Sequence, residues 1–137
     1  MEPQFWLERW QKHEIGFHQS APHPALARFW SRLALRPGAR VFVPLAGKSL
    51  DMLWLAQAGF QVVGIELSPI AVAQFAAEHA PEARRNVELR CGDFFALTRA
   101  ALGPVDAVFD RAALVALPAA QRRDYVAQMT WLTGSGC

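Results

Sequence analysis

Carboxylates stand at the ends of short apolar segments of the sequence. Glu66 ends the run 60–66, Asp110 ends the run 105–110, and Asp93 follows a third run by two residues. In parallel α/β sheets, ligands bind beyond the carboxyl ends of the strands. If these runs are strands, their acidic residues converge on one edge of a sheet. The pattern therefore favours a small-molecule site built from strand ends.

Glu66 lies about twenty residues beyond the loop 44–49, the spacing at which nucleotide-binding folds place an acid that accepts hydrogen bonds from ribose hydroxyls. Two vicinal hydroxyls match the two oxygens of one carboxylate. The alternative is a solvated carboxylate that caps a helix beginning at Ser68. Both interpretations place Glu66 at the end of a strand.

The loop 44–49 contains one glycine, Gly47, where the backbone can approach a ligand closely. It precedes an expected helix, whose N-terminus would suit a ligand carboxylate. The glycines of a phosphate-binding P-loop or of a Gly-x-Gly-x-x-Gly dinucleotide loop are absent, which argues against an oxidoreductase with a nucleotide cofactor. An ordinary strand–helix turn is the alternative.

Three further positions carry chemistry near the expected strand ends. Asp93 and Phe94 could meet the amino group and the ring face of an adenine; alternatively, Asp93 could cap a turn while Phe94 and Phe95 join the core. Arg111, beside Asp110, could pair with a ligand carboxylate or an anionic substrate, or it could form an internal ion pair. His18 lies in a segment that would cover the site, although a lone histidine in a loop more often has no such role.

Helices and strands alternate in the order needed to position these residues. We expect helices at 5–13, 26–35, 50–58, 68–79 and 121–132, and strands at 40–45, 60–66, 86–91 and 105–110. Ser49 and Ser68 are predicted N-caps. The alternation predicts an α/β fold with a doubly wound, mostly parallel sheet. We expect a single domain, in which residues 1–37 form a helical cover and residues 38–137 a βαβ core.

The composition supports a packed domain. Of the 137 residues, 53% are hydrophobic and 19% charged, which argues against disorder. The net charge is +2 and the basic residues form no block, so nucleic acid is not an expected partner. Cys91 and Cys137 provide no disulfide framework or metal-ligand spacing. Without a signal-like N-terminus or an apolar span, we expect a cytoplasmic protein that does not contact a membrane.

Six segments of the chain, in this order, resemble the bacterial thiopurine S-methyltransferases. They are Phe5-Trp6 with Trp10, then 15–18, 43–52, 63–68, 91–95 and 109–118. The resemblance implies a class I S-adenosylmethionine (SAM)-dependent methyltransferase fold, Rossmann-like in topology. It also implies four cofactor contacts, namely Trp10, Leu45, Glu66 and Arg111, to which the residue-level reasoning adds Gly47, Asp93 and Phe94. By the same resemblance Phe17 and His18 cover the substrate, and the acceptor is an aromatic or heterocyclic thiol, or a related selenium or tellurium species.

The chain departs from the family pattern in three places. Ala46 stands where the family usually has cysteine, and the connection 80–85 is shorter than in the family. The chain also stops after the helix that follows the fourth strand, where the family continues through three more strands. We therefore expect a C-terminally truncated sheet whose exposed edge could self-associate. The alternative function is an inactive fragment that binds SAM or a partner chain.

Overall fold

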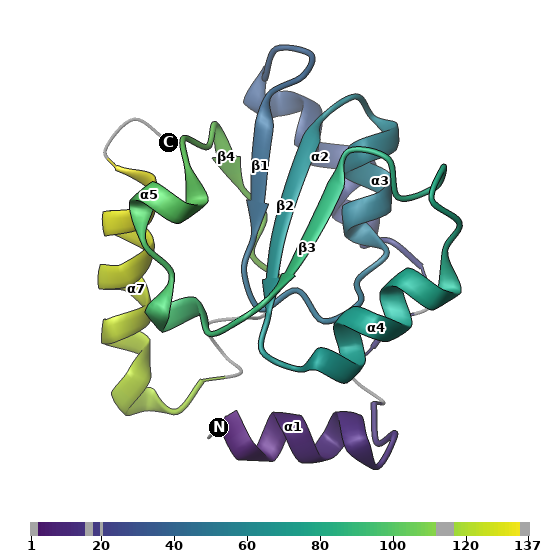
Figure 1. The fold of residues 1–137 in the computed structure, drawn as a ribbon. Helices are drawn as coiled ribbons and strands as arrows, with labels where there is room; N and C mark the ends of the chain where they lie inside the picture. Colours follow the sequence, from purple (N-terminus) through teal and green to yellow (C-terminus); the bar gives the residue numbers. More distant parts are fainter. Residues whose placement is uncertain (1–2, 16–17, 20, 112–116, 135–137) are drawn as a thin grey trace.

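The computed structural model describes residues 3–15, 18–19, 21–111 and 117–134, which contain a four-stranded parallel sheet (Figure 1). Its strands are β1 (Arg40–Val43), β2 (Gln61–Glu66), β3 (Val87–Cys91) and β4 (Ala107–Val108), in the spatial order β3-β2-β1-β4. The chain therefore moves from β1 outward to β3 and then crosses to the other side of β1. This reversal confirms the predicted doubly wound sheet, and it places the switch point between β1 and β4.

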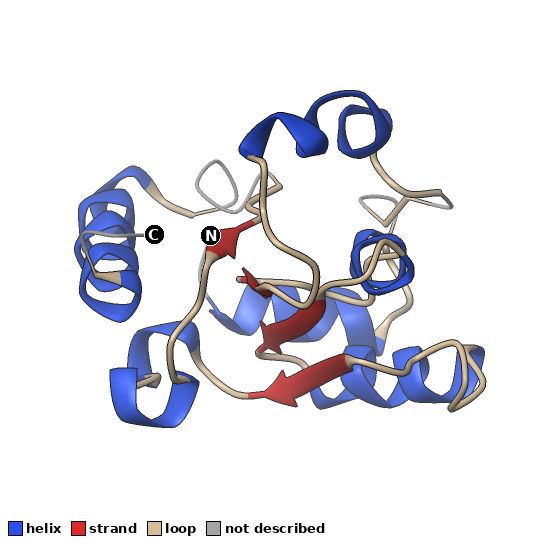
Figure 2. Cartoon of the chain, turned by 90° about the horizontal axis from the view of Figure 1, so that it is seen from above, coloured by secondary structure: helices blue, strands red, loops and turns tan. Residues whose placement is uncertain are grey.

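Helices cover both faces of the sheet (Figure 2). They are α1 (Pro3–Gln11), α2 (Pro24–Phe29), α3 (Asp51–Gln57), α4 (Pro69–Glu78), α5 (Arg99–Leu102) and α7 (Ala119–Thr133), with 3₁₀ turns η1 (Trp30–Leu33) and η2 (Phe94–Ala96). The α1 helix lies across the end of the sheet at which the strands finish (Figure 1). Within the described residues, no helix combines the length and apolar character that a membrane crossing requires.

The core has two halves because successive side chains of a strand point to opposite faces. Val41 and Val43 of β1 pack with the buried residues of α2, α3 and α4. Phe42, between them in sequence, packs on the other face with residues of α5 and α7. Each central strand therefore contributes to two apolar layers, which explains why its sequence is continuously apolar and does not alternate.

One of the two predicted N-caps is confirmed. Ser68 precedes α4, its Oγ accepts a hydrogen bond from Ala71 N–H at 3.2 Å, and Pro69 occupies the first turn. The prediction for Ser49 is wrong, since α3 begins at Asp51 with Leu50 at the N-cap position. The Ser49 hydroxyl instead accepts from Asp51 N–H and donates to the Asp51 carboxylate, so the helix starts after this turn.

The region before α7 differs from the sequence-based expectation. The fourth strand is predicted at 105–110, but β4 has two residues. On either side of them, Asp106 N–H and Phe109 N–H donate to Arg40 O and Phe42 O of β1, and the Asp106 side chain accepts from Arg40 N–H at 2.8 Å. The chain between β3 and β4 contains η2 and α5, neither of which is predicted. A Thr98 side chain that accepts from Ala101 N–H caps α5.

Candidate functional site

A cavity of about 920 Å³ lies at the carboxyl ends of the strands, and Trp6 and Trp10 of α1 contribute to its lining. Its volume falls within the range of about 300–1,000 Å³ that is typical of small-molecule sites. It is lined by all eight described candidates for cofactor or substrate binding, although the strand-end carboxylate Asp110 does not line it; the eight are Trp10, His18, Leu45, Gly47, Glu66, Asp93, Phe94 and Arg111. Phe17, the ninth, lies outside the described residues. The structure thus brings together positions that are up to 101 residues apart in the sequence.

The loop after β1 presents its backbone to the cavity. Leu45 and Gly47 both have positive φ, at 47° and 58°. A left-handed conformation is unusual for leucine and costs about 1–2 kcal/mol. Ala46 N–H donates to Ile65 O at 2.9 Å and ties the loop to β2. A Cβ on Gly47 would lie 3.4 Å from Cζ2 of Trp10, so the indole ring of the cover lies close over this glycine.

Glu66 ends β2 and is 7% exposed. Its Oε1 accepts from Gly47 N–H at 2.9 Å and its Oε2 accepts from Ser68 N–H at 2.8 Å. Burial raises the pKa of the Glu66 carboxyl, against the opposing effect of hydrogen bonds from the backbone of Ser68, Gly47 and Leu67. The expected alternative of a solvated carboxylate is therefore wrong, although Glu66 does bond to the residue that caps α4. These three donors leave the carboxylate one lone-pair site for a further donor.

The residues after β3 divide between cavity and core. Asp93 is exposed, and its Oδ1 accepts from Phe95 N–H at 2.9 Å, which caps η2. Phe94 is 4% exposed and stacks on Tyr125 with ring centroids 4.9 Å apart. The core interpretation therefore holds for Phe94 but not for Phe95, which is exposed. All three residues line the cavity.

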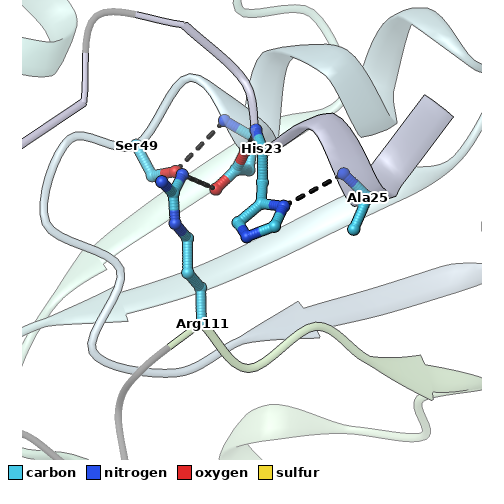
Figure 3. Close-up of polar contacts among 5 residues, drawn as sticks. His23, Ala25, Ser49 and Arg111 are labelled. Carbon is cyan, nitrogen blue, oxygen red and sulfur yellow. Dashed lines mark hydrogen bonds and ion pairs between the residues drawn. The ribbon is translucent and has the colours of Figure 1, made fainter. Parts of the chain in front are cut away.

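The residues after β4 are held by side chains from other elements. Arg111 forms an internal ion pair, with Nη1 3.0 Å from Oδ2 of Asp51 at the start of α3 (Figure 3). Asp110 accepts a hydrogen bond from the Tyr125 hydroxyl of α7. Burial raises the pKa of Tyr125, and this hydrogen bond and the charge of Asp110 raise it further. The alternative of an internal ion pair thus describes Arg111 here, but its partner is not the adjacent Asp110.

A second cationic group faces the cavity beside His18. Lys48 is 5% exposed, and its Nζ lies 2.7 Å from Oε2 of Glu78 on α4. Burial lowers the pKa of the His18 imidazole, as do the charges of Lys48 and Arg111, while Glu78 opposes them. His18 therefore favours its neutral form at this wall of the cavity.

Sequence reasoning assigned no role to Asp51 or Lys48, which both line the cavity and are buried. Their signal is present in the sequence, because both stand within an otherwise apolar stretch. Charged residues are seldom fully buried unless they are paired. Asp51 also changes the interpretation of the loop, since the chain itself supplies a carboxylate where the sequence analysis expected one from a ligand.

Methyltransferases are among the solved structures with a similar fold. The glycopeptide N-methyltransferase MtfA in complex with SAM has a TM-score of 0.68 at 23% identity, over 87% of this chain and 53% of that one. A SAM-dependent methyltransferase from Anabaena variabilis has a TM-score of 0.72 at 19% identity, over 98% of this chain and 58% of that one. The likeness confirms the predicted Rossmann-like SAM-methyltransferase fold.

Curated relatives identify the family more closely. A thiopurine S-methyltransferase of Pseudomonas entomophila is 51% identical over 139 residues, which cover 93% of this chain and 64% of the relative. One from Nitrosomonas eutropha is 45% identical over 149 residues, covering 100% of this chain and 68% of the relative. The chain thus spans about two thirds of the length of these curated relatives. A model of the thiopurine S-methyltransferase family matches residues 1–137, and the chain belongs to this family.

Proposed function

We propose that the chain binds SAM in the 920 Å³ cavity and transfers its methyl group to the sulfur of an aromatic or heterocyclic thiol. The observation that carries the proposal is the convergence of eight candidate residues, from separate segments of the sequence, on one cavity at the strand ends of a methyltransferase fold. Membership of the thiopurine S-methyltransferase family supports the choice of a thiol as acceptor.

The residues present fit SAM in their chemistry. A buried carboxylate that can still accept a hydrogen bond suits a ribose hydroxyl, and Glu66 supplies one. Arg111 suits the carboxylate of the methionine end, and the loop containing Leu45 offers backbone groups beside it. Aromatic rings of Trp10 and Phe94 line the same cavity and suit the apolar parts of the cofactor.

When bound, SAM would supply a methyl group on a sulfonium. The acceptor thiolate would form its bond to the methyl carbon in line as the bond to the donor sulfur breaks, and the electron pair of the broken bond would stay on the donor sulfur. The task of the protein in such a reaction is to hold the reacting atoms in near-attack geometry. Glu66 and Arg111 would fix the two ends of the donor, and Trp10, with Phe17 by the family resemblance, would exclude water. Residues 1–37 would then act as a cover and residues 38–137 as the core.

We assign no general base to the reaction. Thiols with a low pKa lose their proton to solvent and arrive as thiolates, so the protein need not remove it. A neutral His18 and the cations of Lys48 and Arg111 form a wall that would tolerate an anionic acceptor. The related selenium and tellurium species suggested by the family resemblance are acceptors of the same nucleophilic character.

Two measurements test the proposal. Isothermal titration calorimetry with SAM should give saturable binding at one site per chain. Incubation with SAM and a thiopurine, followed by mass spectrometry, should give an acceptor heavier by one methylene unit. Binding without any methylated thiol, selenol or tellurol would overturn the transferase proposal.

That last outcome would favour a second candidate, an inactive chain that binds SAM or a partner protein. The observation in its favour is the same cavity, whose residues fit SAM whether or not a methyl group is transferred. The same calorimetry separates the candidates further, because a chain that binds only a partner protein would give no heat with SAM.

A further inference from the structure

One buried carboxylate joins three distant segments at the wall of the cavity. Asp51 accepts a hydrogen bond from the backbone N–H of His23, another from the hydroxyl of Ser49, and pairs with Arg111 (Figure 3). These partners belong to the segment before α2, to the loop after β1 and to the exit of β4. Asp51 therefore connects the N-terminal segment, the loop after β1 and Arg111.

The contacts of Asp51 fix the orientation of its carboxylate. His23 N–H binds Oδ1 at 2.5 Å, whereas the Ser49 hydroxyl binds Oδ2 at 2.8 Å. The residue is 1% exposed, so water does not compete for these bonds. Since both oxygens are held independently of Arg111, the carboxylate is a fixed acceptor on which the longer arginine side chain can dock.

We propose that Asp51 is a positioning residue that holds the Arg111 guanidinium ready for the carboxylate of the methionine end of SAM. The inference rests on the proposed function, since it assigns Arg111 to that carboxylate. A guanidinium carries five N–H donors, and the ion pair with Asp51 uses Nη1. Arg111 can therefore hold Asp51 and a ligand carboxylate at the same time, without being released from one to bind the other.

Asp51 also carries a negative charge near the expected ligand carboxylate. Repulsion between these two charges would lower the affinity for the ligand, whereas positioning of Arg111 would raise it. Two hydrogen-bond donors and the arginine itself neutralise much of that charge. Without Asp51, the partly exposed Arg111 side chain would have to be ordered by the ligand, which costs affinity. We infer that positioning has the larger effect.

Asp51→Asn tests this directly because it changes few atoms. Three donors converge on Asp51, and an asparagine has one acceptor oxygen and one NH₂ group. In either orientation the NH₂ group faces a donor, either His23 N–H or the pair formed by Ser49 and Arg111. The substitution removes the charge of the ion pair and leaves one donor facing another in either orientation, so it weakens the hold on the Arg111 guanidinium.

The test compares two ligands by isothermal titration calorimetry. S-adenosylhomocysteine carries the carboxylate, and 5′-methylthioadenosine has the same nucleoside but lacks the amino-acid end. Asp51→Asn should weaken S-adenosylhomocysteine about tenfold, as expected for loss of one charge-assisted contact, and change 5′-methylthioadenosine by less than about twofold. Equal weakening of both ligands, or no weakening of the first, would overturn the inference.

The control is Asp106→Asn, at the opposite end of the sheet. Asp106 also accepts from a backbone N–H and lies near an arginine, Arg36. This variant should bind both ligands as the unaltered chain does. If the unaltered chain binds neither ligand, the proposed function fails, which is distinguishable from selective loss in Asp51→Asn.

A double-mutant cycle separates positioning from direct contact. Arg111→Gln should weaken S-adenosylhomocysteine, and adding Asp51→Asn to it should cost no further affinity, because there is no guanidinium left to position. Additive losses would overturn the inference. Should Asp51→Asn fail to fold, Asp51→Glu keeps the charge but displaces the carboxylate, and the same ligand selectivity applies.

A measurement without any ligand gives a spectroscopic readout. The Nε–H signal of Arg111 in a ¹⁵N spectrum can be assigned by its disappearance in Arg111→Gln. It should be sharp and shifted from the free-arginine position in the unaltered chain, and should move toward that position in Asp51→Asn. An unchanged signal would show that Asp51 does not order the guanidinium.

Discussion

The exits of β2 and β4 both contribute charged residues to the cavity, but the protein holds them in different ways. β2 has six residues, pairs with a strand on each side, and ends on Glu66, whose two oxygens are bound by backbone N–H groups. β4 has two residues and, within the described part of the chain, pairs with β1. Its exit residues Asp110 and Arg111 are held by the side chains of Tyr125 and Asp51.

The difference concerns what each exit can do when a ligand arrives. Backbone donors are fixed by the fold, so Glu66 has its position as soon as the strands and the cap of α4 form. Side-chain partners can change rotamer, so the exit of β4 can adjust. We expect substitutions at the β2 exit to lower the free energy of unfolding more than substitutions at the β4 exit do.

Glu66→Ala should have the largest effect. It removes the acceptor of two backbone N–H groups, those of Gly47 and Ser68. A buried unsatisfied donor costs about 1–3 kcal/mol, and water from the cavity offsets part of this, so the free energy of unfolding should fall by about 2–4 kcal/mol. Urea denaturation measures it.

The matched control for Glu66→Ala is Asp93→Ala. Asp93 also accepts a backbone N–H, that of Phe95, but from an exposed position. Loss of such a cap costs about 1 kcal/mol. Equal costs for the two variants would contradict the idea that burial makes the β2 exit depend on its carboxylate.

Tyr125→Phe should have a smaller effect at the other exit. It removes the hydroxyl that donates to Asp110, and the exposed carboxylate of Asp110 can turn to water. The free energy of unfolding at neutral pH should fall by about 1–2 kcal/mol, as for a hydrogen bond to a partly solvated charge. A loss as large as that of Glu66→Ala would show that the β4 exit is no more adjustable than the β2 exit.

The raised pKa of Tyr125 adds a second measurement. Above the ordinary tyrosine pKa of about 10, the unfolded chain loses the hydroxyl proton and the folded chain keeps it, so stability falls as the pH rises. Tyr125→Phe should lack this fall. Since the sequence contains a single tyrosine, the change in ultraviolet absorbance on tyrosine ionisation reports Tyr125 alone. Ionisation of the Tyr125 hydroxyl near pH 10 in the folded chain would contradict the structure.

The contacts that could be predicted from the sequence are those made with backbone, and the contacts that could not are those made between distant side chains. Glu66 and the Gly47 loop were predictable because each follows a long apolar run, and their contacts are with backbone close to those runs. The partner of Arg111 was not predictable, since Asp51 is 60 residues away and meets it through side-chain packing. The length of β4 was not predictable either. Its apolar run is that of a full strand, and which of its residues pair with β1 depends on tertiary packing that the run does not encode.

Gly47→Ala tests whether the loop after β1, which donates to Glu66 at the β2 exit, depends on backbone conformation alone. Its φ of 58° strains any residue with a Cβ, and the new methyl would lie 3.4 Å from Trp10. The expected loss is about 1 kcal/mol in thermal or urea denaturation. Gly38→Ala is the control, because Gly38 also has positive φ but has no atom within 4 Å of the added Cβ. A much larger loss at Gly47 would show that the Trp10 ring, and not backbone alone, holds this loop.

The pH dependence of Glu66 should give the smallest effect. Burial raises the pKa of its carboxyl in the folded chain, so between the ordinary pKa of about 4.3 and the raised value the folded state binds more protons than the unfolded state. Stability from this group is therefore present at low pH and lost as the pH rises through that window. Relative to Glu66→Gln, the unaltered chain should lose unfolding free energy on going from acid to neutral pH, with a slope below about 1.4 kcal/mol per pH unit.

Glu78→Gln provides the opposite sign, because the hydrogen bond from Lys48 lowers the pKa of Glu78, so its contribution is lost as the pH falls. If both variants shift the curve in the same direction, the Glu66 carboxylate is stabilised by its backbone donors more than it is penalised by burial, and the β2 exit would hold its charge without cost.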